Sequence, residues 1–398
     1  MIVAGWVLRA ALPGVSVHTP DEGVYASYAT TLYRDGLGSV PGMLRTYNQT
    51  PELWVYPSPV RVGYLWILTG AMHLTQTANL EITTAVSAVF SGLSLVLLAW
   101  IAYRFFDPWV ALVSLLFLAV SPLDLAIARR TWQEAVVACF ALALVGAALA
   151  AMRQRSSPGW AVALLVLGGY ALLIKETNSI VFALCALGLA VAWIARGRRR
   201  AACLLLGGAA ATVVASATVL VATAGGIDEL RAVYARLFVS GQATEYFRKY
   251  QTGGPMYYVK GLGILHPAPF LLGFVGCVLA ILPERWARVL SADSERLRAL
   301  RFTSVYVLGF SAVALLHTQK NLRFLSVIYA PAYLMAAALV QAIARGVALR
   351  LPRSRARVAV AVLGLSLVVL AGFDLQRFIR YFVAEGIPDL ATPWFTKR

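Results

Sequence analysis

The sequence carries few charges for its length. Only 13% of its 398 residues are Asp, Glu, Lys or Arg, and 60% are hydrophobic, whereas a soluble domain has about 25% charged residues and about 45–50% apolar ones. Apolar runs close to the roughly 20 residues that cross a bilayer recur at 82–101, 135–152 and 201–224. The composition excludes a water-soluble core and predicts a polytopic membrane protein.

The sequence also lacks the motifs of common metal and nucleotide sites. Its four cysteines all lie inside apolar runs, its four histidines are scattered, and no Cys-x-x-Cys or His-Glu-x-x-His spacing occurs. There is no Walker loop and no dinucleotide fingerprint. We therefore assign no metal ligand and no cofactor. A divalent cation stays open, because two or three oxygen ligands cannot be assigned from spacing.

The net charge of +17 could indicate nucleic-acid binding, since clustered Lys and Arg are the electrostatic mark of such proteins. Here the cations form short clusters between apolar runs. This pattern is typical of topology signals and of contacts with lipid headgroups. We expect membrane lipid, and no nucleic acid, as a partner.

The apolar runs predict an all-α protein with about eleven transmembrane helices. The candidate spans are 1–17, 80–103, 109–127, 133–152, 159–174, 178–195, 201–224, 261–282, 302–316, 325–344 and 358–373. The first is short and carries Arg9, which suggests that residues precede Met1. A further apolar stretch at 62–74 is too short to span, and we expect it to lie at the outer interface or to re-enter.

With 62–74 left out, the loops fall into two alternating sets. One set has about 17 Lys and Arg residues and 4 acids in roughly 50 residues. The other set has about 17 Lys and Arg residues and 14 acids in roughly 140 residues. The positive-inside rule makes the first set cytoplasmic. The second set is then extracytoplasmic (periplasmic). It comprises a first loop at 18–79, with helices lying along the membrane, a second long loop at 225–260 and a short tail at 374–398, while residues 1–373 form the transmembrane domain.

Adjacent acids begin the amphipathic segment in the first outer loop. Thr19, Pro20 and Glu22 have the spacing of a helix start with a capping box, which explains Glu22 structurally. Asp21 can instead face a cavity at membrane level and take a proton from an acceptor hydroxyl, as a general base. The spacing alone leaves both interpretations open.

Cations recur in the outer turns. Arg129 and Arg130 are either interfacial side chains beside an aromatic belt or a phosphate site that Glu134 orients. Lys175 lies in a short turn that is either solvated or marks a site at membrane depth. A face that gathers cations and acids suits a reaction in which a phosphate leaves and a hydroxyl attacks. The other cations of the predicted outer turns are Arg61, Lys320 and Arg323.

Several short motifs, in order along the chain, resemble the GT-C superfamily of membrane glycosyltransferases, especially the branch of protein O-mannosyltransferases and lipid A aminoarabinose transferases. These motifs are Asp21-Glu22-x-x-Tyr25-Ala26, Tyr56-Pro-Ser-Pro59 with Gly63-Tyr-Leu-Trp66, Arg129-x4-Glu134, Lys175, Gly254-Pro-Met-Tyr-Tyr258 with His266-Pro267, and Lys320-x-x-Arg323-Phe324 before Pro331.

The resemblance implies an inverting transfer from a polyprenyl-phosphate sugar to an extracytoplasmic lipid, glycan or protein. Asp21 would be the base, with Glu22 and Glu134 as further acids of the catalytic site. The donor phosphate and sugar would be bound by Tyr25, Arg61, Arg129, Arg130, Lys175, Lys320 and Arg323. Glu134 stands where the family has Asp, Phe324 where it has Tyr, and the large tail domain of the aminoarabinose enzymes is missing. The acceptor is therefore open.

Two other functions are compatible with cations at membrane level. A flippase or transporter of lipid-linked saccharides would also bind phosphate, but it should show polar groups through its spans and often internal repeats, and neither is evident here. A non-catalytic membrane scaffold could retain the motifs for folding alone. Covalent transfer of sugar to an acceptor distinguishes the enzyme from both.

Overall fold

The computed structural model describes residues 1–11, 18–153, 158–237 and 244–396, and all its regular elements are helical. The end of the first predicted span and parts of two predicted loops, 154–157 and 238–243, lie outside the described residues. Seven helices are long and apolar enough to cross a membrane. They are α5 (Leu80–Phe105), α8 (Glu134–Arg153), α10 (Thr177–Ile194), α11 (Arg199–Ala224), α17 (Ser294–Leu316), α18 (Ser326–Arg350) and α19 (Arg353–Phe378).

An eighth span is formed by two helices that meet at a break, α6 (Pro108–Val120) and α7 (Pro122–Ala128). Pro122 has no N–H to continue the helix, and the Ser121 side chain accepts a hydrogen bond from the Asp124 N–H to start the next one. The two axes differ by 59°. The chain is thus an all-helical polytopic membrane protein with seven or eight candidate spans among the described residues.

Three further predicted spans coincide with shorter apolar helices. These are α1 (Ile2–Ala11), α9 (Gly159–Ile174) and α15 (Pro267–Ile281), of 10, 16 and 15 residues. A helix needs about 17 residues or more to cross the hydrocarbon layer upright, so these three, as far as their residues are described, do not meet the length criterion. The predicted total of about eleven spans therefore stays a prediction.

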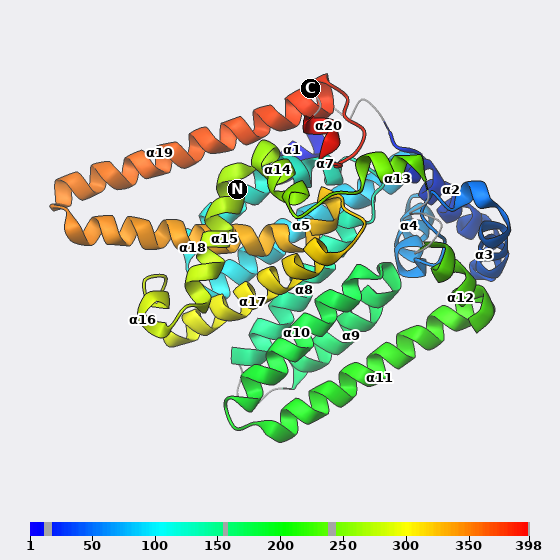
Figure 1. The fold of residues 1–398 in the computed structure, drawn as a ribbon, viewed down its shortest axis with the longest axis horizontal. Helices are drawn as coiled ribbons and strands as arrows, with labels where there is room; N and C mark the ends of the chain where they lie inside the picture. The colour runs from blue at the N-terminus through cyan, green and yellow to red at the C-terminus, as the bar shows by residue number, and fades with distance from the viewer. Residues whose placement is uncertain (12–17, 154–157, 238–243, 397–398) are drawn as a thin grey trace.

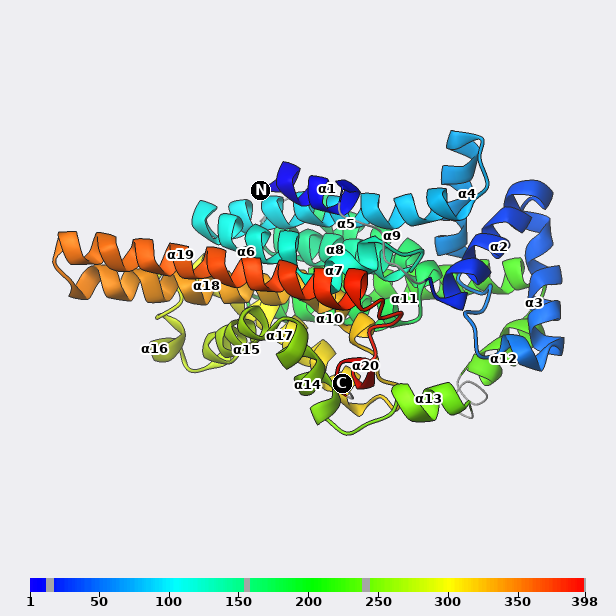
Figure 2. The ribbon, with the colours of Figure 1, turned by 90° about the horizontal axis from the view of Figure 1, so that it is seen from above.

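The remaining helices are short and lie mostly near the two ends of the bundle (Figures 1 and 2). They are α2 (Pro20–Asp35), α3 (Val40–Gln49), α4 (Val62–Thr75), α12 (Ile227–Ala235), α13 (Glu245–Tyr250), α14 (Met256–Leu265), α16 (Glu284–Ala287) and α20 (Pro393–Thr396), with 3-10 turns η1 (Leu37–Ser39), η2 (Pro51–Leu53) and η5 (Leu322–Leu325) and a π turn η6 (Ile379–Ala384). Helix α4, the short apolar stretch, runs across the direction of α5 in Figure 2. Its direction supports the prediction that it does not span.

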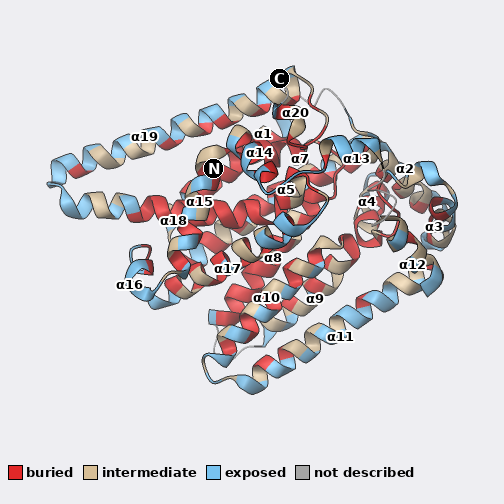
Figure 3. Cartoon of the chain, viewed as in Figure 1, coloured by how far each residue is buried: buried red, intermediate tan, exposed pale blue. Residues whose placement is uncertain are grey.

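Helices α8 and α18 form the centre of the bundle. The apolar stretches of both are more than four-fifths buried, whereas those of α11 and α19 are only 17% buried, as the colours of Figure 3 show. Gly273 and Gly276 of α15 allow close packing on α18, because a Cβ there would lie 2.6 and 2.7 Å from the carbonyl oxygens of Ala332 and Met335. Lipid is the environment that covers apolar helices left so exposed.

The two ends of the bundle differ in their residues. Helices α8 and α17 each extend from a large pocket at one end to a polar cavity of about 250 Å³ at the other, and α10 extends from the same pocket to the turn that carries Arg196 of that cavity. That second cavity is lined by Arg104, Arg153, Arg196, Arg296 and Arg298. We call the end of the bundle that contains this cavity the basic end, and the opposite end the pocket end. The predicted basic loops therefore gather together, about 30 Å from the pocket along α8, at 1.5 Å per residue.

Candidate active site

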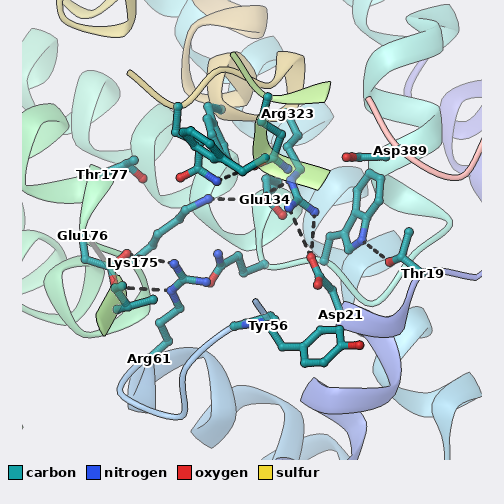
Figure 4. A pocket seen from close by; sticks show the side chains of 18 of the residues that line it. Thr19, Asp21, Tyr56, Arg61, Glu134, Lys175, Glu176, Thr177, Arg323 and Asp389 are labelled. Atoms are coloured by element: carbon teal, nitrogen blue, oxygen red, sulfur yellow. Dashed lines mark hydrogen bonds and ion pairs between the residues drawn. The ribbon is translucent and has the colours of Figure 1, made fainter. Parts of the chain in front are cut away.

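A pocket of about 680 Å³ lies at the pocket end, and its lining includes residues of α2, α8, α10, α13, α17 and η5. Figure 4 shows its side chains from close by. Among the described residues, and leaving histidines and tyrosines aside, its ionisable acids and bases are four carboxylates and three Arg or Lys side chains. These are Asp21, Glu134, Glu176 and Asp389 with Arg61, Lys175 and Arg323. They come from segments more than 360 positions apart in the sequence.

Asp21 sits in the first turn of α2. The predicted capping box is present: Thr19 is the N-cap, Pro20 begins the helix and Glu22 bonds back to the Thr19 N–H at 2.7 Å. This start fixes the turn that carries Asp21, whose Oδ2 accepts hydrogen bonds from Nη1 and Nη2 of Arg323, each at 3.2 Å. About one-fifth of the Asp21 side chain is exposed. It can therefore meet a ligand in the pocket.

Burial raises the pKa of the Asp21 carboxyl above its usual range. The Arg323 guanidinium opposes this shift, and the negative charges of Asp389 and Glu134 add to it. A carboxylate of raised pKa is a better proton acceptor than a free one at neutral pH.

Glu134 joins two of the cations. Its Oε1 lies 2.7 Å from Lys175 Nζ and 3.9 Å from Arg323 Nε. Glu134 begins α8, where negative charge is favoured by the helix dipole. The Lys175 ammonium also lies over the Phe324 ring, 4.9 Å from its centre. Burial lowers the pKa of Lys175, and the nearby Glu134 carboxylate limits that shift.

Arg61 holds the other side of the pocket. It contacts Glu176 Oε2 through Nη2 at 3.2 Å and donates from Nη1 to the Tyr25 hydroxyl at 2.7 Å. Burial alone would lower the pKa of Arg61, but its contacts with Glu176 and Tyr25 raise it. Burial alone would raise the pKa of Glu176, but the Arg61 guanidinium holds it below its usual range. With its amide oriented to match its neighbours, Gln133 accepts from Arg61 Nη1 at 2.9 Å. The three cations thus share one polar network.

Six of the ten predicted site residues line this pocket: Asp21, Tyr25, Arg61, Glu134, Lys175 and Arg323. Two others lie behind its wall. Glu22 is fully buried and accepts hydrogen bonds from Arg130 Nη1 at 3.1 Å and from the Thr131 N–H at 3.2 Å. Arg130 also donates to the Ile387 carbonyl at 3.1 Å and lies over the Trp132 ring. The Glu22 and Arg130 side chains therefore stabilise the wall and do not line the cavity.

The last two predicted residues contact backbone carbonyls. Arg129 donates to the carbonyl of Arg9. Lys320 places its Nζ 2.9 Å from the Leu315 carbonyl and 2.7 Å from that of His317, at the end of α17. A cation there caps the exposed carbonyls of a helix end. Neither residue lines the pocket.

Two acids of the pocket were not predicted as site residues. Glu176 follows Lys175, which was predicted to lie in a short turn, and no role was assigned to Glu176 from the sequence. Asp389 lies in the C-terminal tail, where no motif marks it, and it accepts a hydrogen bond from the Tyr246 hydroxyl at 2.6 Å. No group of three or more His, Cys, Asp or Glu side chains suited to a metal ion occurs in the described part of the chain.

The arrangement has the components of a phosphate-releasing reaction. Arginine and lysine side chains stabilise developing phosphate charge, and a buried carboxylate of raised pKa can take a proton. The aromatic rings of Trp132 and Phe324 lie beside Arg323, with centres 5.1 and 5.8 Å from its Cζ. They limit the contact of this guanidinium with water.

Residues 59–221 match the family model of dolichyl-phosphate-mannose-protein mannosyltransferases. The match includes Arg61, Glu134 and Lys175, whereas Asp21, Arg323 and Asp389 lie outside it. No curated protein sequence matches the chain.

Solved structures share the fold over nearly the whole chain. The apo structure of ArnT from Cupriavidus metallidurans is 17% identical, with a TM-score of 0.57, and the match covers 99% of this chain and 74% of that one. The structure of ArnT from Cupriavidus metallidurans bound to undecaprenyl phosphate is also 17% identical, with a TM-score of 0.55, and the match covers 99% of this chain and 73% of that one. The oligosaccharyltransferase AglB from Archaeoglobus fulgidus, in complex with an inhibitory peptide and a dolichol-phosphate, is 13% identical, with a TM-score of 0.57, and the match covers 98% of this chain and 55% of that one.

The chain shares the fold of ArnT and of AglB, and the predicted resemblance is confirmed. Residues 59–221 are similar in sequence to the dolichyl-phosphate-mannose-protein mannosyltransferase family.

Proposed function

We propose that this protein transfers a sugar from a polyprenyl-phosphate donor to the hydroxyl of a lipid, glycan or protein acceptor, with Asp21 as the general base. The observation that carries the proposal is the position of Asp21. Its carboxylate is partly exposed to the pocket and lies within 3.2 Å of Arg323, beside the Glu134 and Lys175 pair.

The reaction is a single displacement. Asp21 takes the proton of the acceptor hydroxyl, whose oxygen forms a bond to C1 of the sugar as the bond from C1 to the phosphate oxygen breaks. Attack from the side opposite the phosphate inverts the configuration at C1. The polyprenyl phosphate leaves with the bonding electron pair, and Arg323, Lys175 and Arg61 stabilise its charge.

Glu134 acts in this proposal as the group that holds two phosphate-binding cations. It contacts both Lys175 and Arg323, so it fixes the distance between them. Tyr25 holds Arg61 in position, because its hydroxyl accepts a hydrogen bond from Arg61 Nη1. Glu22 and Arg130 hold the start of α2 against the segment that precedes α8. That ArnT was solved with undecaprenyl phosphate and AglB with a dolichol-phosphate supports a lipid phosphate as the donor class.

The pocket belongs, in this proposal, on the extracytoplasmic face. The basic loops lie at the other end of α8, α10 and α17, and the positive-inside rule assigns such loops to the cytoplasm. With the short helices α1, α9 and α15 counted as spans, eleven crossings put α2, α13 and the tail on one side, as the sequence predicts.

The test is sugar transfer by purified protein in lipid with a labelled polyprenyl-phosphate sugar. Asp21→Asn should reduce transfer by about 10²- to 10⁴-fold, the usual contribution of a general base. Asp35→Asn is the matched control, since Asp35 is exposed at the other end of α2, and it should transfer at the wild-type rate. Full activity of Asp21→Asn would remove Asp21 from the mechanism.

A further inference from the structure

The C-terminal segment after η6 forms part of the pocket wall. Pro388 and Asp389 line the cavity. Backbone contacts hold this segment in place, because the Leu390 carbonyl accepts from the Leu322 N–H at 3.1 Å and the Ile387 carbonyl accepts from Arg130. A segment that looks like a simple tail in the sequence is therefore packed against the turn that carries Arg323.

Asp389 is the polar centre of this contact and is only 4% exposed. Asn321 Nδ2 donates to both of its carboxylate oxygens, at 3.1 and 3.0 Å, and the Tyr246 hydroxyl donates to Oδ2 at 2.6 Å. The Leu390 N–H donates to Oδ1 at 2.7 Å. One carboxylate thus joins the tail, the η5 turn and α13.

Asn321 links Asp389 to Arg323 by hydrogen bonds. It is fully buried and is the N-cap of η5, and its Oδ1 accepts the Arg323 N–H at 3.0 Å. The Asn321 amide therefore uses its donor on Asp389 and its acceptor on the backbone of Arg323. Removing one member of a buried hydrogen-bonded chain leaves the others unsatisfied and free to shift.

We propose that Asp389 is a positioning residue for the transfer reaction: through Asn321 it fixes the turn from which Arg323 reaches the leaving phosphate and Asp21, and through Tyr246 it fixes α13 on the pocket. This inference rests on the proposed function, because it assigns Arg323 to the donor phosphate. Asp389 itself does not bind the phosphate, since both are anions.

A reciprocal exchange tests this directly. Asp389→Asn replaces one of the two oxygens that accept from Asn321, Tyr246 and Leu390 with an amino group that cannot accept, and Asn321→Asp sets two carboxylates against each other. The double variant rebuilds one donor and acceptor pair in the reverse direction with the same atoms and total charge, and the new residue at 321 still offers an oxygen to the Arg323 N–H. Glu385→Gln is the matched control, an acid of the same segment that pairs with Arg380 away from the pocket.

The measurements are kcat/KM for the lipid-linked donor and the Kd of undecaprenyl phosphate alone. Each single variant should lose about 100-fold in kcat/KM, the effect of a misplaced reacting group, and bind the probe about tenfold more weakly. The double variant should recover at least about tenfold of the lost kcat/KM, and Glu385→Gln should match the wild type.

Two failures are distinguishable. If the wild type transfers sugar and binds the probe but Asp389→Asn matches Glu385→Gln, the positioning role is wrong and the proposed function stands. The same conclusion follows if the singles lose activity and the double variant recovers none. If the wild type neither transfers sugar nor binds undecaprenyl phosphate, the proposed function is wrong, and the role of Asp389 is wrong with it.

Discussion

The two ends of the helical bundle use similar ion pairs in different environments. At the basic end, Arg298 lies 2.8 Å from Glu295, and both side chains are more than two-fifths exposed. At the pocket end, Lys175 lies 2.7 Å from Glu134, and both are almost fully buried. An exposed pair contributes about 0.2–1 kcal/mol, whereas breaking a buried one costs about 3–5 kcal/mol. Burial, and not distance, separates the two ends.

The difference follows from what each set of charges does. At the basic end the side chains of this pair are exposed, so the number of such cations matters more than their geometry. Each of the three cations that line the pocket has a carboxylate partner from a segment far away in the chain. This comparison predicts which substitutions change activity and which do not.

Glu134→Gln should have the largest effect. It leaves Lys175 and Arg323 in a buried site without the carboxylate that contacts both, so we expect a loss of about 3–5 kcal/mol in the free energy of unfolding and almost no sugar transfer. Thermal unfolding in detergent and the transfer assay measure the two effects. Glu295→Gln at the basic end is the matched control and should stay within about 0.5 kcal/mol of the wild type. Equal effects at the two ends would refute the comparison.

Arg323→Lys should have an intermediate effect. Lysine keeps the charge but cannot donate from two nitrogens to Asp21 Oδ2 as Arg323 does. Hydrogen bonds to charged groups are worth about 1.5–3 kcal/mol, so kcat/KM should fall about 10- to 100-fold. Arg298→Lys, at the exposed end, should leave kcat/KM unchanged. Wild-type activity of Arg323→Lys would show that charge alone suffices in the pocket.

The pH dependence should show the smallest of the three effects. Burial raises the pKa of Asp21, and a general base acts only when ionised. Transfer should therefore fall as the pH drops through this raised pKa, at a higher pH than an exposed aspartate would give. A kcat/KM profile for the wild type measures this acid limb. The residual rate of Asp21→Asn should lack it, and a limb that persists in that variant belongs to another group.

The sequence predicted those parts of the site that local rules describe. The capping box accounts for Thr19, Pro20 and Glu22, and it left Asp21 as the acid without a structural task. Lys175 stood out because a cation between two apolar spans is costly unless it has a partner. Both residues line the pocket.

The family resemblance placed Glu22 in the catalytic site and Arg130 at the donor phosphate, whereas both side chains lie behind the pocket wall. Successive residues on a helix point about 100° apart, so the side that meets the pocket depends on how α2 packs on α4 and on the segment before α8. Only the tertiary structure supplies that orientation. The same holds for Lys320, whose contacts with the end of α17 have no sequence motif.

The number of spans and the tail show two further limits. Composition located apolar helices at every predicted span, but three of them are too short for length alone to make them spans. Asp389 carries no pattern of its own in the tail and reaches the pocket only because the segment after η6 folds back onto η5. Long-range contacts of this kind depend on packing that no local spacing encodes.

The most direct test of the central claim is mass analysis of cell-envelope lipids, glycans and proteins in cells that lack the gene and carry either the wild type or Asp21→Asn. We predict one class of acceptor whose mass falls by a sugar unit in the deleted cells and returns with the wild type but not with Asp21→Asn. If Asp21→Asn restores that mass in full at equal protein level, Asp21 is not the base and the account is wrong.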